Sequence, residues 1–322
     1  MTSDHKDVVN HSSTGKGSTG TGGVEAQQLS SAKDIPQNLA NNLLEKISDR
    51  ANLLNAWKAV KRNKGAPGTD GRTIKDVEER LDDVIEGISI KLNEGNYKPS
   101  SVKGVAIPKP DGNERLLGIP NIEDRIVQQA ITQILTPIFD PYFSDHSYGF
   151  RPDRSAGQAI EVAADYVKDG YDIVVDIDVE KFFDRVNYDI LMSKLAKSIL
   201  DKPLLKLIRL FLQAGMMKDG VKVKRDKGMP QGGPLSPLLS NIFLHVLDIE
   251  LSRRGHKFVR YADDCNIYVK SELAGRRVLK SITEFLARKL KLQVNKAKSA
   301  VGKPRKHKFL GFTITNLEDI NL

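Results

Sequence analysis

Two apolar segments that carry aspartates constrain the fold of this chain more than any other feature. The run from Ile173 to Ile177 is almost entirely apolar, and Asp176 and Asp178 lie at its C-terminal end. Because side chains alternate along a strand, both carboxylates are expected on the same face. A second apolar segment, residues 258–269, carries Asp263 and Asp264 at a tight bend. The pattern predicts adjacent buried strands that present acids at one edge of a sheet.

Carboxylates gathered at the edge of an apolar sheet repel one another and lose hydration. One Asp pair at a bend is more often an ordinary turn, but two acidic sites on buried strands are tolerated chiefly when cations neutralise them. Mg²⁺ prefers one or two carboxylates plus phosphate oxygens, and two ions about 3.5 to 4 Å apart can clamp an in-line phosphoryl displacement. We therefore expect two Mg²⁺ ions, replaceable by Mn²⁺, bridged by Asp178 and Asp263 and supported by Asp264.

The remaining pattern indicates an α+β domain, because helices alternate with strands and hairpins. Residues 1–35 are rich in Ser, Thr and Gly and predict a flexible low-complexity tail. Apolar spacing and capping residues predict helices over residues 39–62, 74–92, 122–137, 155–168, 204–212, 234–253 and 273–292, with a further helix starting at Asn187. Strands or hairpins are predicted over residues 102–120, 171–177, 216–224 and 258–269, with two closing strands near 299 and at 309–315.

Charge and composition limit the classes of function that the chain can have. Residues 253–308 contain 17 Lys and Arg against 4 Asp and Glu, although the whole chain carries only +9, and so lopsided a block favours a nucleic-acid surface over an ordinary solvated face. A single cysteine, Cys265, excludes an internal disulfide, and the six His lack the spacing of a zinc site. The absence of a long apolar stretch and of a signal region predicts a cytoplasmic protein with no membrane partner.

The bend Tyr261-Ala262-Asp263-Asp264 resembles the catalytic hairpin of reverse transcriptases, in the version typical of bacterial group II intron maturases. Other blocks follow in the family's order. They are IPKPDGNERLLGIP (107–120), DRIVQQAI (124–131), HSYGFRPDRSAGQAI (146–160), DIDVEKFFDRVN (176–187), GMPQGGPLSPLLSNIFL (228–244), LQVNKAKS (292–299) and FLGF (309–312). The resemblance covers residues 40 to 315 and implies an RNA-directed DNA polymerase.

The resemblance also implies roles for residues near the acids. The family's catalytic aspartate is followed five positions later by an aromatic residue, which fits Asp178 and Phe183, whereas Asp176 would place a lysine there. Asp178 is then the metal ligand, assisted by the backbone carbonyl of Val179. Phe183 would lie under the incoming sugar and select deoxynucleotides, while Phe182 is assigned to the core. Gln231 matches the glutamine that abuts the new base pair.

Basic residues complete the implied substrate site. Lys109 and Arg115, in the predicted hairpin over residues 102–120, match the residues that grip the triphosphate, where an arginine offers a planar fork. Lys298 matches a lysine that assists the leaving pyrophosphate. Arg151 is expected to touch template phosphates.

The resemblance divides the chain into a tail (1–35), an N-terminal extension with fingers (36–170) and a palm (171–322) that includes some finger residues. The fold class expected is the fingers and palm of a right-hand polymerase, with an antiparallel palm sheet packed on helices. The expected fold does not include a thumb domain. Without a thumb, we expect poor processivity of the polymerase.

The implied partners are group II intron RNA for splicing and retrohoming, an RNA template, a DNA primer and deoxynucleoside triphosphates. The sequence leaves open whether the chain forms a homodimer. It also leaves three alternatives. The first is a retron, diversity-generating or CRISPR-associated reverse transcriptase, the second an RNA-binding splicing factor without polymerase activity, and the third a nucleotide cyclase with a palm-like sheet.

Overall fold

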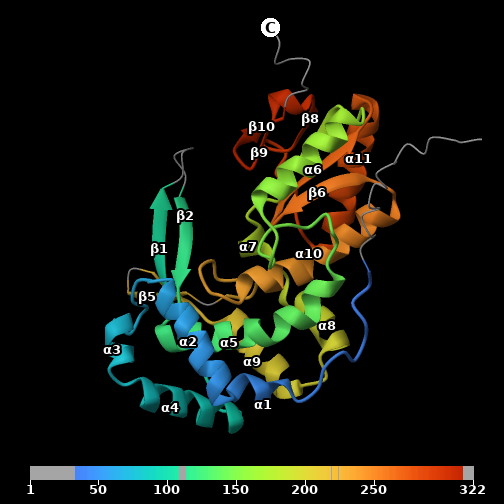
Figure 1. Ribbon diagram of the computed structural model, residues 1–322. Coiled ribbons are helices and arrows are strands. Elements are labelled where there is room, and N and C mark those ends of the chain that lie inside the picture. Colours follow the sequence, from blue (N-terminus) through green and yellow to red (C-terminus); the bar gives the residue numbers. More distant parts are fainter. Residues whose placement is uncertain (1–32, 109–113, 219, 224, 315–322) are drawn as a thin grey trace, which may run out of the picture.

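The structure, a computed structural model, describes residues 33–108, 114–218, 220–223 and 225–314. A layer of helices forms one end of the molecule and an antiparallel sheet lies toward the other (Figure 1). The helical layer consists of α1 (Leu43–Ser48), α2 (Arg50–Arg62), α3 (Ile74–Glu78), α4 (Leu81–Asn93), α5 (Ile122–Phe139), α8 (Tyr188–Ser198) and α9 (Lys202–Gln213). This mixture of helices and antiparallel sheet confirms the predicted α+β class. Most of the predicted tail lies outside the described residues.

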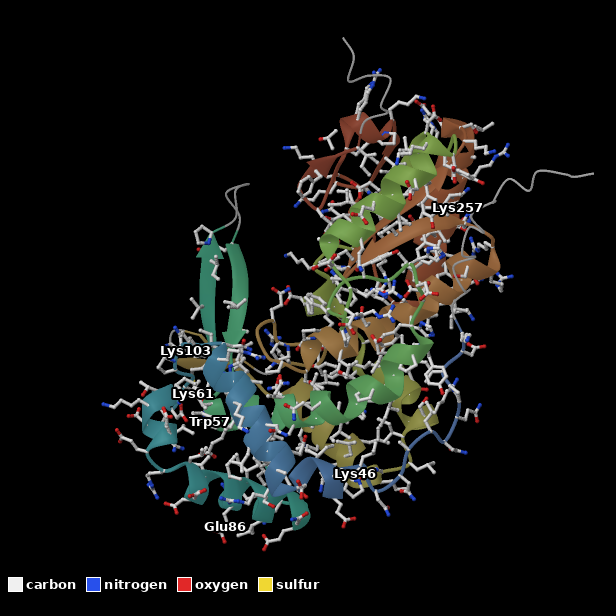
Figure 2. The ribbon with its side chains drawn as sticks, viewed as in Figure 1. Lys46, Trp57, Lys61, Glu86, Lys103 and Lys257 are labelled. Carbon is white, nitrogen blue, oxygen red and sulfur yellow. The ribbon has the colours of Figure 1, made fainter. Side chains whose placement is uncertain are left out.

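Two of the predicted helices are each divided in the structure. The chain has α1 and α2 where one helix is predicted over residues 39–62, because Asp49 stands between them with an extended backbone. Its carboxylate accepts hydrogen bonds from the backbone N–H groups of Ala51 and Asn52 and so caps α2. The helix predicted over residues 74–92 is likewise divided into α3 and α4. Trp57, on α2 (Figure 2), is 4% exposed and lies in the core.

Two hairpins that are distant in sequence form one sheet, called here the hairpin sheet, with the order β2-β1-β4-β5. Its strands are β1 (Val102–Pro108), β2 (Glu114–Ile119), β4 (Met216–Lys218) and β5 (Val221–Val223). Strands β1 and β2 form the predicted antiparallel pair, with Pro108 opposite Glu114. Strand β4 runs parallel to β1 and pairs Met217 with Lys103, which lies toward the base of the projecting β1–β2 hairpin (Figure 2). The sequence did not predict this parallel pairing.

The second sheet, called here the palm sheet, has the order β6-β7-β3-β8 and is antiparallel throughout. Its strands are β6 (Lys257–Tyr261), β7 (Asp264–Val269), β3 (Ile173–Ile177) and β8 (Ala300–Gly302). Helix α11 (Glu272–Phe285), continued by a π-helical turn η2 (Leu286–Leu290), packs on the face that carries Ile173 and Val175. Helix α6 (Ala156–Lys168) packs on the opposite face, against Val174, Val259 and Tyr268.

Helix α10 (Ser236–Arg253) joins the two ends of the molecule, because it contacts α5 and α8 in the helical layer and β6 in the palm sheet. Most of its residues are buried, and these include the polar side chains of Asn241, His245 and Asp248. The remaining elements are η1 (Asp140–Tyr142), α7 (Phe182–Arg185), η3 (Pro304–Lys306), β9 (Lys308–Phe309) and β10 (Phe312–Thr313). In the part of the chain that the structure describes, no helix is both long and apolar enough to cross a bilayer.

The carboxylate of Asp201 connects two helices, and its loss should cost more than the loss of an ordinary cap. It accepts hydrogen bonds from the backbone N–H of Leu204, which caps α9, and from that of Leu44 in α1, and it is 7% exposed. Because Asp201→Ala leaves both N–H groups without a partner in a buried place, we expect it to lower the free energy of unfolding by about 2–3 kcal/mol.

The matched control is Asp49→Ala, which removes the exposed cap of α2 and should cost about 1 kcal/mol. Urea unfolding followed by circular dichroism measures both losses. Equal losses in the two variants would contradict the linking role of Asp201.

Candidate active site

The register of the palm sheet brings the acids of separate segments to one place. The β3–β7 ladder ends with Ile177 opposite Cys265, and the β6–β7 ladder ends with Tyr261 opposite Asp264. Asp178 directly follows Ile177, and Asp264 directly precedes Cys265, so the two aspartates occupy the next position along the same ladder. Residues opposite one another in an antiparallel pair share a face of the sheet. Asp178 and Asp264 therefore lie beside each other at the end of the palm sheet.

The face that carries these acids changes from apolar to acidic along the strands. Its far end is formed by Val174 opposite Tyr268 and is covered by α6. There Lys257 lies over the ring of Tyr166 of α6, 5.6 Å from its centroid (Figure 2). Next along the face come Asp176 and Asn266, which are paired in register, and then Asp178 and Asp264 at the end of the ladders. The strand period of two thus gathers the carboxylates at one end of a single face.

Two of these acids have raised pKa values. Loss of hydration and, next, the negative charge of Asp178 raise the pKa of Asp176 to about 6. Loss of hydration and the charges of Asp263, Asp176 and Asp178 raise the pKa of Asp264 to about 6, although residue 264 as a whole is solvent-exposed. All four predicted acids lie close enough to interact through their charges.

The predicted metal site is not preassembled. In the described ranges, no group of three or more Asp, Glu, His or Cys side chains is arranged to hold a metal ion. The donor chemistry still fits Mg²⁺, because the raised pKa values of Asp176 and Asp264 reflect lost hydration and, next, repulsion between carboxylates, both of which a bound cation would offset. Mg²⁺ also needs only one or two protein carboxylates when substrate phosphates supply further oxygens. The carboxylates therefore suit a cation that arrives together with a phosphorylated substrate.

The segment that follows η2 holds the backbone on both sides of Val179. Asn295 donates its backbone N–H to the carbonyl of Asp178, and Glu180 donates its own to Gln293 (both 2.9 Å). In this pattern the carbonyl of Val179 points away from that segment, which is compatible with its predicted use as a ligand. Ser299 accepts a hydrogen bond of 2.9 Å from the N–H of Asp178 through its hydroxyl. The exposed Lys298 therefore lies one residue from a direct contact to Asp178.

The predicted sugar-binding phenylalanine lies beside the loop that carries Gln231. Phe183 is 8% exposed, packs edge-on against Phe182 at 5.1 Å, and accepts a hydrogen bond of 2.6 Å from the N–H of Met229 through its carbonyl. Phe182 also packs against Phe243 and lies in the core, as expected. The carbonyl of Gln231 accepts a hydrogen bond of 2.7 Å from Gly118 of β2. This loop therefore connects the Phe183 turn to the hairpin sheet.

The predicted basic contacts have different outcomes. Lys109 lies outside the described residues, and Arg115 is placed opposite Ile107 only through its backbone. The structure does not support the predicted contact of Arg151 with template phosphates. Its side chain is 5% exposed, and its guanidinium donates to both carboxylate oxygens of Asp140 and to three backbone carbonyls. All five N–H groups are used inside the protein, so none remains for a template phosphate. Arg151 stabilises the fold instead.

Sequence reasoning missed a buried arginine beneath the acidic bend. Arg260 lies in β6 with a side chain that is 0% exposed, and it forms an ion pair with Asp248 of α10, which is equally buried. The signal was available, because Arg260 interrupts the apolar run Phe258-Val259-Arg260-Tyr261 and Asp248 interrupts an apolar helix. Charged residues in such positions are almost never fully buried unless they are paired. Both belong to the immediate support of the site.

Comparison with known proteins agrees with this geometry. The family described as reverse transcriptase (RNA-dependent DNA polymerase) matches residues 107–314. Protein YkfC of Escherichia coli (strain K12) is 35% identical over 218 residues, which cover 66% of this chain and 57% of that protein. The group II intron-encoded protein LtrA of Lactococcus lactis subsp. cremoris is 35% identical over 206 residues, which cover 64% of this chain and 34% of that protein.

Two further similarities extend over more of the chain. The putative COX1/OXI3 intron 1 protein of Saccharomyces cerevisiae is 30% identical over 272 residues, covering 81% of this chain and 31% of that protein. A solved structure titled "Partial Cas6-RT-Cas1--Cas2 complex" is similar over 77% of this chain and 43% of its own, with 26% identity and a TM-score of 0.50. This chain thus spans between 31% and 57% of the length of these three curated relatives. Because the family match covers more than half of the sequence and includes all four acids of the palm sheet, the chain belongs to the reverse transcriptase (RNA-dependent DNA polymerase) family.

Proposed function

We propose that this chain is an RNA-directed DNA polymerase that adds deoxynucleotides to the 3′-hydroxyl of a DNA primer on an RNA template. The observation that carries the proposal is the acidic end of the palm sheet, where Asp264 interacts with Asp263, Asp176 and Asp178. Membership of the reverse transcriptase family supports it. A nucleotide cyclase and an RNA-binding protein without polymerase activity explain the data less well. Neither needs the acids together with the other sequence blocks, described above, that resemble those of reverse transcriptases.

The residues of the site have distinct proposed roles. Asp178 and Asp263 hold two divalent cations with the backbone carbonyl of Val179, and Asp264 supports them. When bound, Mg²⁺ or Mn²⁺ would lower the pKa of the attacking hydroxyl and neutralise charge on the triphosphate. Asp176 is assigned no ligand role, because the fifth residue after it is Lys181, whereas the fifth residue after Asp178 is the aromatic Phe183.

The neighbouring residues handle the nucleotide. Phe183 lies at the turn beside the acids and excludes a 2′-hydroxyl, and Gln231 borders the new base pair. Lys109 and Arg115 neutralise the triphosphate from the hairpin, while Lys298 assists the leaving pyrophosphate. We take residues 36–170 as the fingers and 171–322 as the palm, with residues 40–315 as the catalytic unit. The pairing of β4 with β1 supports the interleaving of finger and palm segments.

We further propose that the polymerase serves a group II intron, binding the intron RNA for splicing and retrohoming. The support is its similarity to LtrA and to the yeast COX1 intron 1 protein, together with the basic block over residues 253–308. A CRISPR-associated reverse transcriptase is the second candidate, because a structure with that composition in its title resembles this chain. Crosslinking to total cellular RNA distinguishes the two, since only the first role enriches a group II intron.

Removing one of the proposed ligands should abolish polymerisation. We expect Asp263→Ala to reduce incorporation of deoxynucleotides on an RNA template by more than about 100-fold, because loss of a ligand exceeds the 10–100-fold cost of losing a ligand's partner. Primer extension with purified protein measures the rate, and EDTA should stop the reaction of the parent chain. Equal rates for the parent and Asp263→Ala would exclude the proposed chemistry.

The two acids of β3 should behave differently when each is replaced by asparagine. Asp178→Asn should abolish incorporation, whereas Asp176→Asn should keep it within about 10-fold of the parent, because Asp176 is assigned no ligand role. Primer extension under saturating Mg²⁺ measures both rates. The assignment is wrong if Asp176→Asn is the inactive variant.

Asp176→Asn should also stabilise the cation-free protein at neutral pH. The pKa of Asp176 is about 6 in the folded state, above the ordinary value of 3.8, so folding holds its proton more tightly and stability falls as pH rises from about 4 to about 6. We expect the variant to gain about 1–2 kcal/mol at pH 7 and little at pH 4, after allowance for partial exposure. Urea unfolding in EDTA measures this, with Glu86→Gln on the exposed surface of α4 (Figure 2) as the control for loss of a charge.

A further inference from the structure

A completely buried arginine lies directly beneath the acidic bend. Arg260 is 0% exposed and precedes Asp263 by three residues. Removing a guanidinium from water is costly, and the cost is recovered only when the charge is paired and its N–H groups are all satisfied. The partners of Arg260 therefore indicate what the fold gains from burying it.

The guanidinium of Arg260 uses each of its five N–H groups. Two of them form a fork with the carboxylate of Asp248, at 2.7 and 2.6 Å. The other three donate to the hydroxyl of Ser147 (2.7 Å), to the side-chain oxygen of Asn241 (3.0 Å) and to the backbone carbonyl of Ala262 (2.7 Å). One buried side chain thus connects α10 and the 146–149 segment to the peptide group that precedes Asp263.

Ala262, whose carbonyl accepts from Arg260, has an unfavourable backbone conformation. Ala262 has φ = 58°, in the left-handed region, which costs a residue with a Cβ about 1–2 kcal/mol. Its carbonyl belongs to the same peptide plane as the N–H of Asp263. By accepting from Arg260, this carbonyl fixes the plane and, with it, the direction in which the Asp263 side chain leaves the backbone.

The 146–149 segment closes the other side of the bend. Arg260 donates its backbone N–H to the carbonyl of His146 and accepts from the N–H of Tyr148, both at 2.8 Å. A Cβ on Gly149 would lie 2.3 Å from the backbone nitrogen of Ala262, so only glycine allows this approach. Asn241 donates from its amide to the carbonyl of Gly149 at 2.9 Å. The bend is therefore held between Gly149 and Arg260, and Asn241 binds both.

We propose that Arg260 is a positioning residue for polymerisation, which acts with Asp248, Asn241 and Gly149 to fix the direction of the Asp263 and Asp264 carboxylates. The inference rests on the proposed function of those carboxylates as cation ligands. A purely structural ion pair would need only the fork to Asp248. The bond to the carbonyl of Ala262 and the contact with Gly149 concern the bend itself.

The decisive variant removes both charges together. Arg260→Met alone would leave Asp248 buried without a partner and would unfold the protein, whereas Arg260→Met with Asp248→Leu replaces the pair by apolar side chains of similar size. We expect the double variant to fold, with lower stability than the parent, because Ser147, Asn241 and the carbonyl of Ala262 each lose a buried donor. Hydrogen–deuterium exchange of the peptide spanning residues 258–269 should become faster, and kcat for primer extension should fall about 100-fold with little change in the KM for deoxynucleotides.

A double variant that folds, keeps the parent's exchange rate at the bend and keeps its kcat would overturn the proposal. Should this variant fail to fold, Gly149→Ala gives the same test from the other side of the bend, and Arg260→Lys keeps the charge but loses the fork. Both should raise exchange at residues 258–269 and lower kcat, and unchanged values in both would likewise overturn the proposal.

Two controls separate positioning from general destabilisation. Arg209→Met removes an arginine of α9 that lies outside the basic block and pairs with Asp189 of α8 at 3.0 Å, in the helical layer and away from the bend. Leu195→Ala lowers stability from within the helical layer. Neither should change kcat per active molecule or exchange at the bend. If the parent itself incorporates no deoxynucleotide, the proposed function fails, while the exchange measurement still decides whether Arg260 orders the bend.

Discussion

The antiparallel pairing of β7 with both β3 and β6 determines where every acid of the palm sheet lies. A strand repeats its facing direction every two residues, so one register places Val174, Asp176 and Asp178 on a single face. A shift of one residue would turn Asp178 toward α11 and bury its charge in the apolar core. The apolar residues at the far end, which α6 covers, therefore fix the register that exposes the acids at the near end. The packing of α6 on the palm sheet and the position of the acids therefore depend on the same alternation of side chains along the strands.

The acidic end of this face combines repulsion at the surface with one compensating charge below it. Asp176 and Asp264 each take on a pKa near 6 because burial and neighbouring carboxylates disfavour their charged forms. Burial also opposes the charge of Arg260, but Asp248 and, more weakly, Asp263 raise its pKa, so it stays protonated. The guanidinium thus stabilises the bend without supplying a group that reaches the substrate, and the negative field on the outer side stays available for cations.

Local patterns predicted the parts of the fold that local physics controls. The strand that precedes Asp178, the bend with Asp263 and the cap of α8 at Asn187 follow from alternation and capping chemistry. The parallel pairing of β4 with β1 joins segments more than 100 residues apart and leaves no local signal. Arg151 was misassigned because its ion pair with Asp140 depends on the fold of the residues between them and leaves no periodic signal in the sequence. Single charged residues within apolar runs, such as Arg260, were the sequence signal for buried ion pairs.

The loop between β5 and α10 connects the hairpin sheet to the turn that carries Phe183. Gly228 and Met229 donate backbone N–H groups to Val186 and Phe183, and a Cβ on Gly228 would lie 2.8 Å from the carbonyl of Phe183. Three residues later, the carbonyl of Gln231 accepts from Gly118, and a Cβ on Gly232 would lie 2.7 Å from the carbonyl of Gly118. Since both ends of this short loop are held by backbone contacts, a displacement of β2 must move Gln231 and press on the Phe183 turn. Under the roles proposed above, the triphosphate contacts of the hairpin and the sugar contact of Phe183 are thus linked through a few peptide groups.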